Sequence, residues 1–232
     1  MRYDKDRIQE RLKTLATQHA SPYSTLVCAM GDHWKPGSLE AVEKMVAYTR
    51  NEFGIDARFR IIKDMCYEPF DAIGSMRNVA YRLSLIEGFE FLMYLDNDVL
   101  PPEHTLVQLL HRHLPIASPQ IVYPDGEAHG LATPTLTPDQ GLVMCGSVVL
   151  SCVLFKTTVF LPWAINNFWG NAIGDDEEYH FTKLYMAGHM PFVDTDIQIM
   201  CVEPPHFPLD NKRTAEEVAA AQTNRPKLYV VR

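Results

Sequence analysis

The amino-acid sequence predicts an α/β fold, with one domain built on a mostly parallel central sheet flanked by helices. Strand and helix patterns alternate along the first half of the chain, as they do where helices connect parallel strands. The strand pattern from Phe91 to Leu95 is apolar or aromatic throughout, which is typical of a strand buried on both faces. The 232 residues, 47% of them hydrophobic, suffice for one large core.

The first two strands and the helix between them have clear signals. Strands are expected at residues 23–30 and 57–62, where apolar runs end at Gly31-Asp32 and Lys63-Asp64. A helix is expected to follow Pro36-Gly37-Ser38 and to end at Gly54. Its inward positions are predicted to be Leu39, Val42, Met45, Val46 and Phe53.

Two further helices flank the apolar strand. One is expected to begin at Ser75, to carry Val79, Leu83 and Ile86 at helical spacing, and to end at Gly88. The other opens at Pro101-Pro102-Glu103 and places leucines on one face. These helices complete the alternating series.

The second half of the chain is less regular. It predicts a strand at 116–122, one or two strands within 142–154, a helix over 175–187 and a strand at 197–202. The segment 124–141 is rich in Pro, Gly and Thr and lacks apolar periodicity, so a long loop that is either functional or disordered is expected there. A capping box, Thr214 with Glu217, predicts a short helix before a last strand at 228–231.

The segment before the first strand is charged at its start and helical in pattern. Residues 6–19 carry Ile8, Leu12 and Leu15 at helical spacing. Residues 1–7 are too charged for a secretory signal peptide, and no apolar run reaches the ~20 residues that span a bilayer. We therefore expect no membrane span and a cytoplasmic location.

Charge and cysteine usage narrow the function classes. The formal net charge of −8 argues against a nucleic-acid-binding surface. The five cysteines are odd in number and lack CxxC spacing, so we expect reduced core residues rather than disulfides or a zinc site. They are Cys28, Cys66, Cys145, Cys152 and Cys201.

Asp96-Asn97-Asp98 is the motif that carries the most chemistry. It follows the apolar strand directly, and the carboxyl ends of strands are where open α/β sheets bind ligands. Two carboxylates so close together repel each other unless a cation lies between them. Hard oxygen ligands suit Mg²⁺ or Mn²⁺, which commonly accompany phosphate-bearing substrates. The alternative is a polar turn in which Asp caps the next helix.

Further motifs occur in a recognisable order over residues 23–207. Arg77-Asn78 lies on the helix before the aspartates, Gly174-Asp175-Asp176 opens a later helix, Ala187-Gly188 closes it, and His206 follows the next strand. With Asp96-Asn97-Asp98, this set resembles nucleotide-sugar glycosyltransferases of the GT-A fold, in the pattern of the family-2-like inverting enzymes. The resemblance implies a single GT-A, Rossmann-like domain over residues 1–232.

The resemblance implies roles for these residues. Asp96, Asp98 and His206 would hold Mn²⁺ or Mg²⁺, and the nucleotide-diphosphate sugar would bind at Asp32, Asp64, Arg77, Asn78, Asp96 and Asn97. Asp176 is the expected catalytic base, with Asp175 and Glu177 as alternatives. Residues 1–115 would form the nucleotide-sugar half, 116–210 the acceptor and catalytic half, and 211–232 a C-terminal helix and strand.

The expected reaction is sugar transfer to an acceptor hydroxyl on a sugar, lipid-linked or protein partner, with inversion. Phe168 and Trp169 are candidate acceptor contacts, because aromatic faces beside amides suit sugars; the alternative is that they are core residues. Asp175 stands where the family usually has Glu, and Lys183 where it usually has Arg. The Gln-x-x-Arg-Trp motif of processive members is absent, so long-polymer synthesis is not expected.

Two other function classes compete with this one. A strand followed by Asp96-x-Asp98-x-Val also resembles the first motif of haloacid-dehalogenase-like phosphatases, in which Asp96 would be the nucleophile. In those enzymes the nucleophile lies on an early strand, whereas two predicted strands precede it here. The third class is a non-catalytic nucleotide-sugar-binding protein of the same fold.

Overall fold

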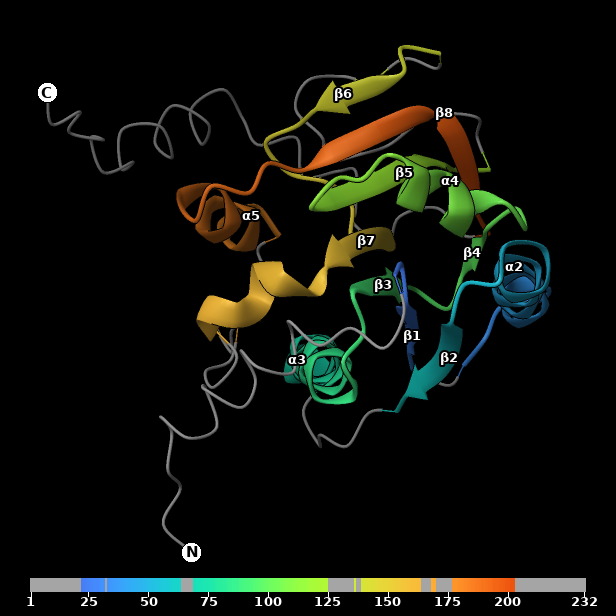
Figure 1. Cartoon of the computed structure of the whole chain (residues 1–232), viewed down its shortest axis with the longest axis horizontal. Coiled ribbons are helices and arrows are strands. Elements are labelled where there is room, and N and C mark those ends of the chain that lie inside the picture. The colour runs from blue at the N-terminus through green and yellow to red at the C-terminus, as the bar shows by residue number, and fades with distance from the viewer. Residues whose placement is uncertain are drawn as a thin grey trace, which may run out of the picture.

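The computed structural model describes residues 22–31, 33–63, 69–124, 136, 139–163, 168–169 and 177–202, with only the backbone described at 69–73 and 177–179. These residues form a mixed, eight-stranded sheet in the order β2-β1-β3-β7-β5-β8-β4, with β6 paired to β8. The strands are β1 Thr25–Met30, β2 Ala57–Ile62, β3 Phe91–Leu95, β4 Val99–Leu100, β5 Ile116–Val122, β6 Leu142–Met144, β7 Cys152–Lys156 and β8 Phe192–Cys201. The α/β prediction is therefore confirmed (Figure 1).

Most of the sheet runs in one direction. β1 is parallel to β2 and β3, and β8 is parallel to β5. β7 lies between β3 and β5 and is antiparallel to both, so β5 runs with β3. The carboxyl ends of β2, β1, β3, β5 and β8 consequently share one edge of the sheet. Only the short strands β4 and β6 also oppose this direction, and both pair with β8.

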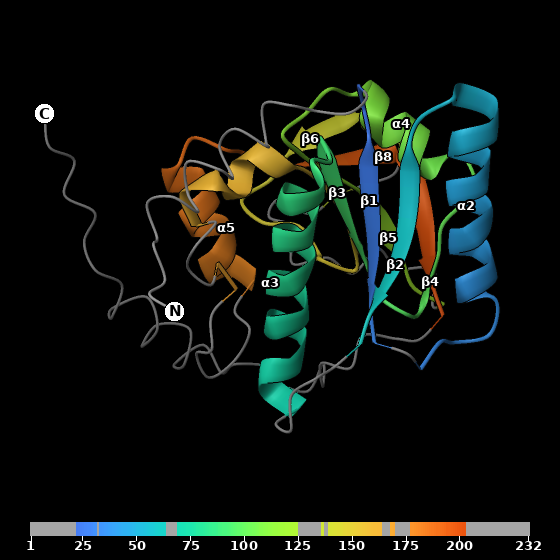
Figure 2. The same ribbon diagram turned by 60° about the horizontal axis from the view of Figure 1, so that its bottom comes forward.

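Helices cover both faces of the sheet. α2 (Ser38–Phe53) and α4 (Thr105–His111) lie on one side, which we call the α2 side. α3 (Pro69–Glu87), the 3-10 helix η1 (Thr157–Trp163) and α5 (Glu177–Met186) lie on the other, the α3 side. Figure 2 shows the sheet between α2 and α3. Among the described residues, no helix is both long and apolar enough to cross a membrane.

Each side of the sheet has its own apolar core. The α2-side core contains Val42, Met45 and the leucines of α4. The α3-side core is richer in aromatic rings, including Tyr94, Phe155 and Trp169. Alternating side chains of β1 and β3 contribute to both cores, as expected of strands that are buried on both faces. Cys28, Cys145, Cys152 and Cys201 are buried, which confirms the core positions predicted for these four, while Cys66 lies outside the described residues.

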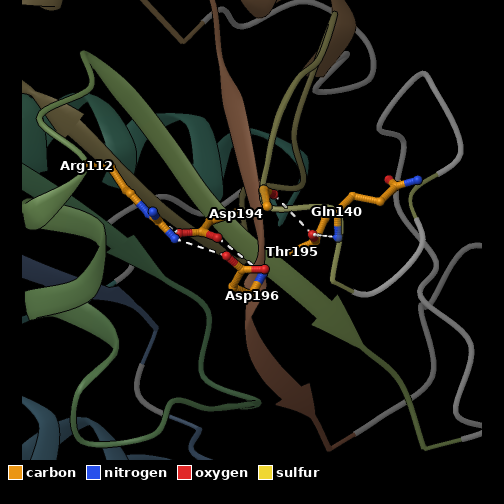
Figure 3. Close-up of polar contacts among 6 residues, drawn as sticks. Arg112, Gln140, Asp194, Thr195 and Asp196 are labelled. Carbon is orange, nitrogen blue, oxygen red and sulfur yellow. Dashed lines mark hydrogen bonds and ion pairs between the residues drawn. The ribbon is translucent and has the colours of Figure 1, made fainter.

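Strand β8 contains an irregularity that redirects it. Its register against β5 jumps between Pro119 and Gln120, whose partners are Asp194 and Gln198. Arg112, at the end of α4, donates to Asp194 Oδ2 at 2.6 Å and to Asp196 Oδ2 at 3.3 Å (Figure 3). Thr195 Oγ1 accepts from the backbone N–H of Gln140 and donates to the carbonyl of Gly141. Side chains from α4 and β8 thus fix the extra residues of the bulge.

The structure corrects several expected boundaries and faces. α3 begins at Pro69 rather than Ser75, and the apolar residues Val79 and Ile86 are exposed on it. Phe53 is exposed because it is the last residue of α2, before Gly54 ends the helix with a positive φ of 65°. β8 begins at Phe192, five residues before the strand predicted to start at 197, because its pairing with β5 continues across the bulge. Most of 124–141, and everything after 202, lies outside the described residues.

Candidate active site at the carboxyl edge of the sheet

Asp96, Asn97 and Asp98 form the turn between β3 and β4, at the shared carboxyl edge of the sheet. The apolar residues of β3 before them are almost fully buried, whereas the three turn residues are only half-buried. The apolar strand therefore ends where the sheet meets solvent, and both carboxylates lie at that boundary. This is the edge at which the sequence predicted a ligand site.

Asp96 is fastened to the segment that leads into β7. The hydroxyl of Ser151 donates to Asp96 Oδ2 at 2.7 Å, and the backbone N–H of Asp96 donates to the carbonyl of Ser151 at 2.9 Å. Two hydrogen bonds between the same two residues fix both the backbone and the carboxylate orientation. Among the described residues, Ser151 is the hydrogen-bond partner of the Asp96 carboxylate.

Asp98 is fastened to the end of β8. The thiol of Cys201 donates to Asp98 Oδ2 at 3.2 Å, and the backbone N–H of Val202 donates to the carbonyl of Asp98 at 2.8 Å. The pairing of Val99 with Cys201 continues this contact into β4. In this way β8, the last described strand, contacts the turn that follows β3.

Asn97 forms hydrogen bonds with the loop that follows β1. Its amide Nδ2 donates to the carbonyl of His33 at 2.6 Å, and its own carbonyl accepts from the backbone N–H of Lys35 at 3.0 Å. These contacts hold residues 33–35 against the turn. The donor contact predicted for Asn97 stays a prediction; its side-chain oxygen or the second N–H of Nδ2 could make it.

The two carboxylates fit a divalent cation in their chemistry. Ser151 and Cys201 are neutral donors, so their hydrogen bonds orient the carboxylates without cancelling the negative charge. Carboxylate oxygens are the ligands that Mg²⁺ and Mn²⁺ prefer. Within the described part of the chain, no group of three or more His, Cys, Asp and Glu side chains could by itself hold a metal ion. His206, the expected third ligand, lies outside the described residues.

Asn78 fastens α3 to the segment that precedes the acidic motif. It is 3% exposed and makes three hydrogen bonds to backbone. Its Nδ2 donates to the carbonyl of Trp169 at 2.8 Å, while its Oδ1 accepts from the N–H groups of Phe168 and Trp169 at 3.0 and 3.1 Å. All of its polar atoms are therefore engaged by protein backbone. Asn78 therefore has a structural role in the described arrangement, and the donor contact expected of it stays a prediction.

The side chains of Phe168 and Trp169 belong to the α3-side core. Both are 0% exposed, because residues from β3, η1 and α5 surround them. The indole N–H of Trp169 donates to the hydroxyl of Tyr94 at 3.2 Å, and Tyr94 lies two residues before Asp96. Of the two interpretations left open by the sequence, core position is the one observed; neither ring offers a face to an acceptor.

Arg77 is also buried on this side. Only 4% of it is exposed, and its guanidinium carbon lies 5.3 Å from the centroid of the Trp169 ring, which is cation–π distance. Its carbonyl accepts from the hydroxyl of Tyr94 at 2.9 Å. A donor phosphate would find little of this side chain accessible in the described arrangement.

Helix α5 is tied to the same aromatic residues. The buried ring of His180 lies 4.8 Å from that of Trp169, and Lys183 Nζ donates to the carbonyl of Phe168 at 3.1 Å. α5 begins at Glu177, directly after the acidic motif. α5 therefore packs against Trp169, which in turn contacts Tyr94 of β3.

Several predicted site residues cannot be placed. Asp32, Asp64, Asp175, Asp176 and His206 lie outside the described residues, and only the backbone of Glu177 is described. Sequence reasoning missed Ser151 and Cys201, which contact Asp96 and Asp98 across 55 and 103 positions of sequence. No local pattern marks these two residues, since each lies in an apolar run and meets its aspartate only through the sheet.

Comparisons with known proteins agree on the fold. No family model matches the sequence, and no curated protein matches it significantly. Protein A197 from STIV matches with a TM-score of 0.52 and 12% identity, over 78% of this chain and 86% of that one. GalNAc-T7, solved with UDP, GalNAc and Mn²⁺, matches with a TM-score of 0.52 and 10% identity, over 79% and 44%.

A mutant of Drosophila β1,4-galactosyltransferase 7, solved with manganese, UDP-Gal and xylobiose, matches with a TM-score of 0.50 and 13% identity. That match covers 88% of this chain and 81% of the other. The chain therefore has an α/β fold that matches GT-A structures. At these identities the similarity establishes the fold alone.

Proposed function

We propose that this GT-A-fold protein is a metal-dependent glycosyltransferase that moves a sugar from a nucleotide-diphosphate sugar to an acceptor hydroxyl. The observation that carries the proposal is the pair of carboxylates of Asp96 and Asp98, which neutral donors fix at the carboxyl edge of the sheet. Two of the matched structures contain UDP or UDP-Gal together with manganese, which supports the choice of donor and metal.

The proposed division of labour follows from the position of each group. Asp96 and Asp98 would hold Mn²⁺ or Mg²⁺, with His206 as a third ligand, and that ion would stabilise the charge on the diphosphate leaving group. Asn97 keeps the loop after β1 against the turn, where the nucleotide is expected with Asp32 and Asp64 as contacts. Asp96 would reach the metal or the ribose through Oδ1, since Oδ2 accepts the hydrogen bond from Ser151.

Deprotonation of the acceptor is assigned to the acidic motif. Asp176 is the proposed base, with Asp175 and Glu177 as alternatives, because a carboxylate facing the sugar takes the proton as the hydroxyl attacks the anomeric carbon. Support comes from the hydrogen bond of Trp169 to Tyr94 of β3 and from the ring contact of His180 of α5 with Trp169, which tie the residues on either side of the acidic motif to one another and to β3. Attack from the face opposite the leaving group gives the proposed inversion.

The test is metal-dependent nucleotide binding. Thermal unfolding of the protein is measured with a panel of nucleoside diphosphates and nucleotide sugars, with and without Mn²⁺. A ligand at 100 times its Kd should stabilise the fold by about 2.7 kcal/mol. Asp98→Ala should lose the part of this stabilisation that depends on Mn²⁺. Glu52→Ala, at an exposed position of α2, should keep it. Equal Mn²⁺-dependent stabilisation of both variants would contradict the site.

Turnover then separates the competing classes. A glycosyltransferase releases nucleoside diphosphate as it transfers the sugar. Transfer to water should be slow, and transfer to an acceptor hydroxyl faster. A non-catalytic binding protein would show the thermal stabilisation but no release. A phosphatase using Asp96 as nucleophile would form a trifluoroberyllate adduct and hydrolyse phosphate monoesters instead.

A further inference from the structure

Gln120, on β5, is a buried polar side chain without hydrogen-bond partners. Only 2% of it is exposed, and neither its amide nitrogen Nε2 nor its amide oxygen Oε1 has a partner among the described residues. Burial of an unpaired amide costs free energy, because the hydrogen bonds that it makes to water in the unfolded chain are lost. A folded protein that keeps such a group needs a reason for it, and a bound substrate supplies one.

The Gln120 side chain lies on the α3 side of the sheet. Ile121, the next residue on β5, belongs to the α2-side core, as does its partner on β8, Ile199. Ile116, four residues before Gln120, belongs to the α3-side core. Because side chains alternate along a strand, Gln120 and its partner Gln198 both lie on the α3 side.

The Asp96 side chain lies on the same side of the sheet. Tyr94, two residues earlier on β3, belongs to the α3-side core. The hydrogen bond from the Asp96 N–H to the carbonyl of Ser151 continues the pairing of β3 with β7 by one residue. The alternation therefore continues to Asp96, and the Ser151 hydroxyl donates to its carboxylate there.

Gln120 and Asp96 are also close along the carboxyl edge. The hydroxyl of Ser118 donates to the carbonyl of Cys152 at 2.9 Å, so β5 still contacts β7 near this edge. Gln120 lies two residues beyond Ser118, and Ser151 directly precedes Cys152. Only β7 separates β3 from β5 in the sheet (Figure 1). The backbones of Asp96 and Gln120 are therefore about 10 Å apart, which is two strand spacings.

The surface beside Gln120 is open on the β8 side. Gln198 and Met200 occupy the same side of the sheet, and both are exposed, Met200 by 54%. Gln120 thus lies between the exposed residues of β8 and the half-buried Asp96. A substrate at this edge would meet the Gln120 amide.

We propose that Gln120 recognises the sugar of the nucleotide-sugar donor, through hydrogen bonds from its amide to sugar hydroxyl groups. This inference rests on the proposed function, in which a metal at Asp96 and Asp98 holds the diphosphate at this edge. A sugar linked to that diphosphate can reach a side chain two strands away. Hydroxyl groups both donate and accept, so they can satisfy Nε2 and Oε1 together. A nucleoside diphosphate without its sugar would leave the amide unpaired.

Titration calorimetry in the presence of Mn²⁺ tests this contact. UDP-Gal, UDP-GlcNAc and GDP-mannose are compared with UDP and GDP, for the wild type, Gln120→Met and Gln198→Met. Methionine keeps the length of glutamine and removes its polar atoms. For the sugar that the wild type binds best, Gln120→Met should lower the affinity relative to that of the bare diphosphate about tenfold. Gln198→Met, at the exposed neighbouring position, should leave this ratio unchanged.

The outcomes separate this inference from the proposed function. An unchanged ratio in Gln120→Met would overturn the inference and leave the proposed function in place. A wild-type protein that binds none of these nucleotides would contradict the proposed function, and the sugar contact would fall with it.

The stability of the ligand-free protein gives a second readout. Because the buried amide of Gln120 has no partner among the described residues, Gln120→Met should raise the midpoint of urea unfolding measured without ligand. Gln198→Met should leave the midpoint unchanged. If Gln120→Met unfolds at the same or a lower urea concentration than the wild type, the amide is already satisfied in the free protein and the inference is wrong.

Discussion

At the scale of single residues, the site depends on two neutral donors that hold the two aspartates. Ser151 reaches Asp96 from the segment before β7, and Cys201 reaches Asp98 from the end of β8. A lysine or arginine in either place would neutralise a carboxylate and compete with a metal ion. A hydroxyl or thiol orients the carboxylate and leaves its charge for the ligand.

The Ser151 hydroxyl should therefore matter for binding more than for folding. Ser151→Ala removes a hydrogen bond to a charged acceptor, an interaction of about 1.5–3 kcal/mol, and frees the Asp96 carboxylate to rotate. We expect Mn²⁺-dependent nucleotide affinity to fall roughly tenfold, as measured by titration calorimetry. Ser151→Thr keeps the hydroxyl and should restore most of the affinity. If Ser151→Ala binds as tightly as Ser151→Thr, the hydroxyl does not position Asp96.

At the scale of elements, ion pairing stabilises the bulge of β8. Asp194 is 0% exposed, and its carboxylate forms an ion pair with Arg112. Arg112 directly follows α4 on the α2 side of the sheet. Before the bulge Val193 points to the α3-side core, and after it Ile197 and Ile199 point to the α2-side core. The extra residues thus change which side chains of β8 face each core, and they set the path that brings Cys201 to Asp98.

Removing Arg112 should destabilise the fold far more than removing an exposed partner. Arg112→Ala leaves the buried Asp194 carboxylate without its cation, at a cost of about 3 kcal/mol in the free energy of unfolding. Arg58→Ala breaks the exposed pair with Asp56 and should cost less than about 1 kcal/mol. Urea unfolding measures both. The double variant Arg112→Ala/Asp194→Asn should be more stable than Arg112→Ala alone; if it is less stable, the charge of Asp194 is not the cause.

At the scale of the whole molecule, the sheet separates two cores that both contain thiols. Cys28 belongs to the α3-side core, and Cys152 to the α2-side core. Burial raises the pKa of both thiols above their ordinary value, and it also raises that of Cys145. A raised pKa means less thiolate at any given pH, and the thiolate is the reactive form.

These thiols should consequently report on the integrity of the whole fold. At pH 8 an aromatic disulfide reagent should label Cys28, Cys145 and Cys152 slowly in the native protein and rapidly in denaturant, with peptide mapping to identify each site. Any nucleotide that stabilises the fold in the thermal unfolding test should slow the labelling of these cysteines further. Rapid native labelling of Cys28 or Cys152 would contradict the burial of that core.

The sequence by itself determined the order of strands and helices in the first half and the place of the Asp96-Asn97-Asp98 turn. Those features depend on local signals: apolar runs, helix caps, and turn residues that act within a few positions. Local signals also gave α2 its end at Gly54. They could not say which face of α3 is inward, because Val79 and Ile86 are apolar yet exposed, whereas Arg77 and Asn78 are polar yet buried.

Only the tertiary structure decided what surrounds the aspartates and what the aromatic residues do. Ser151 and Cys201 reach their partners across the sheet, through the antiparallel insertion of β7 and the bulge of β8. The side-chain amide of Asn78 hydrogen-bonds to the backbone of Phe168 and Trp169, and the rings of these two residues are fully buried in the α3-side core. Such contacts depend on strand order and register, which pair residues far apart in the chain and leave no periodic trace in the sequence.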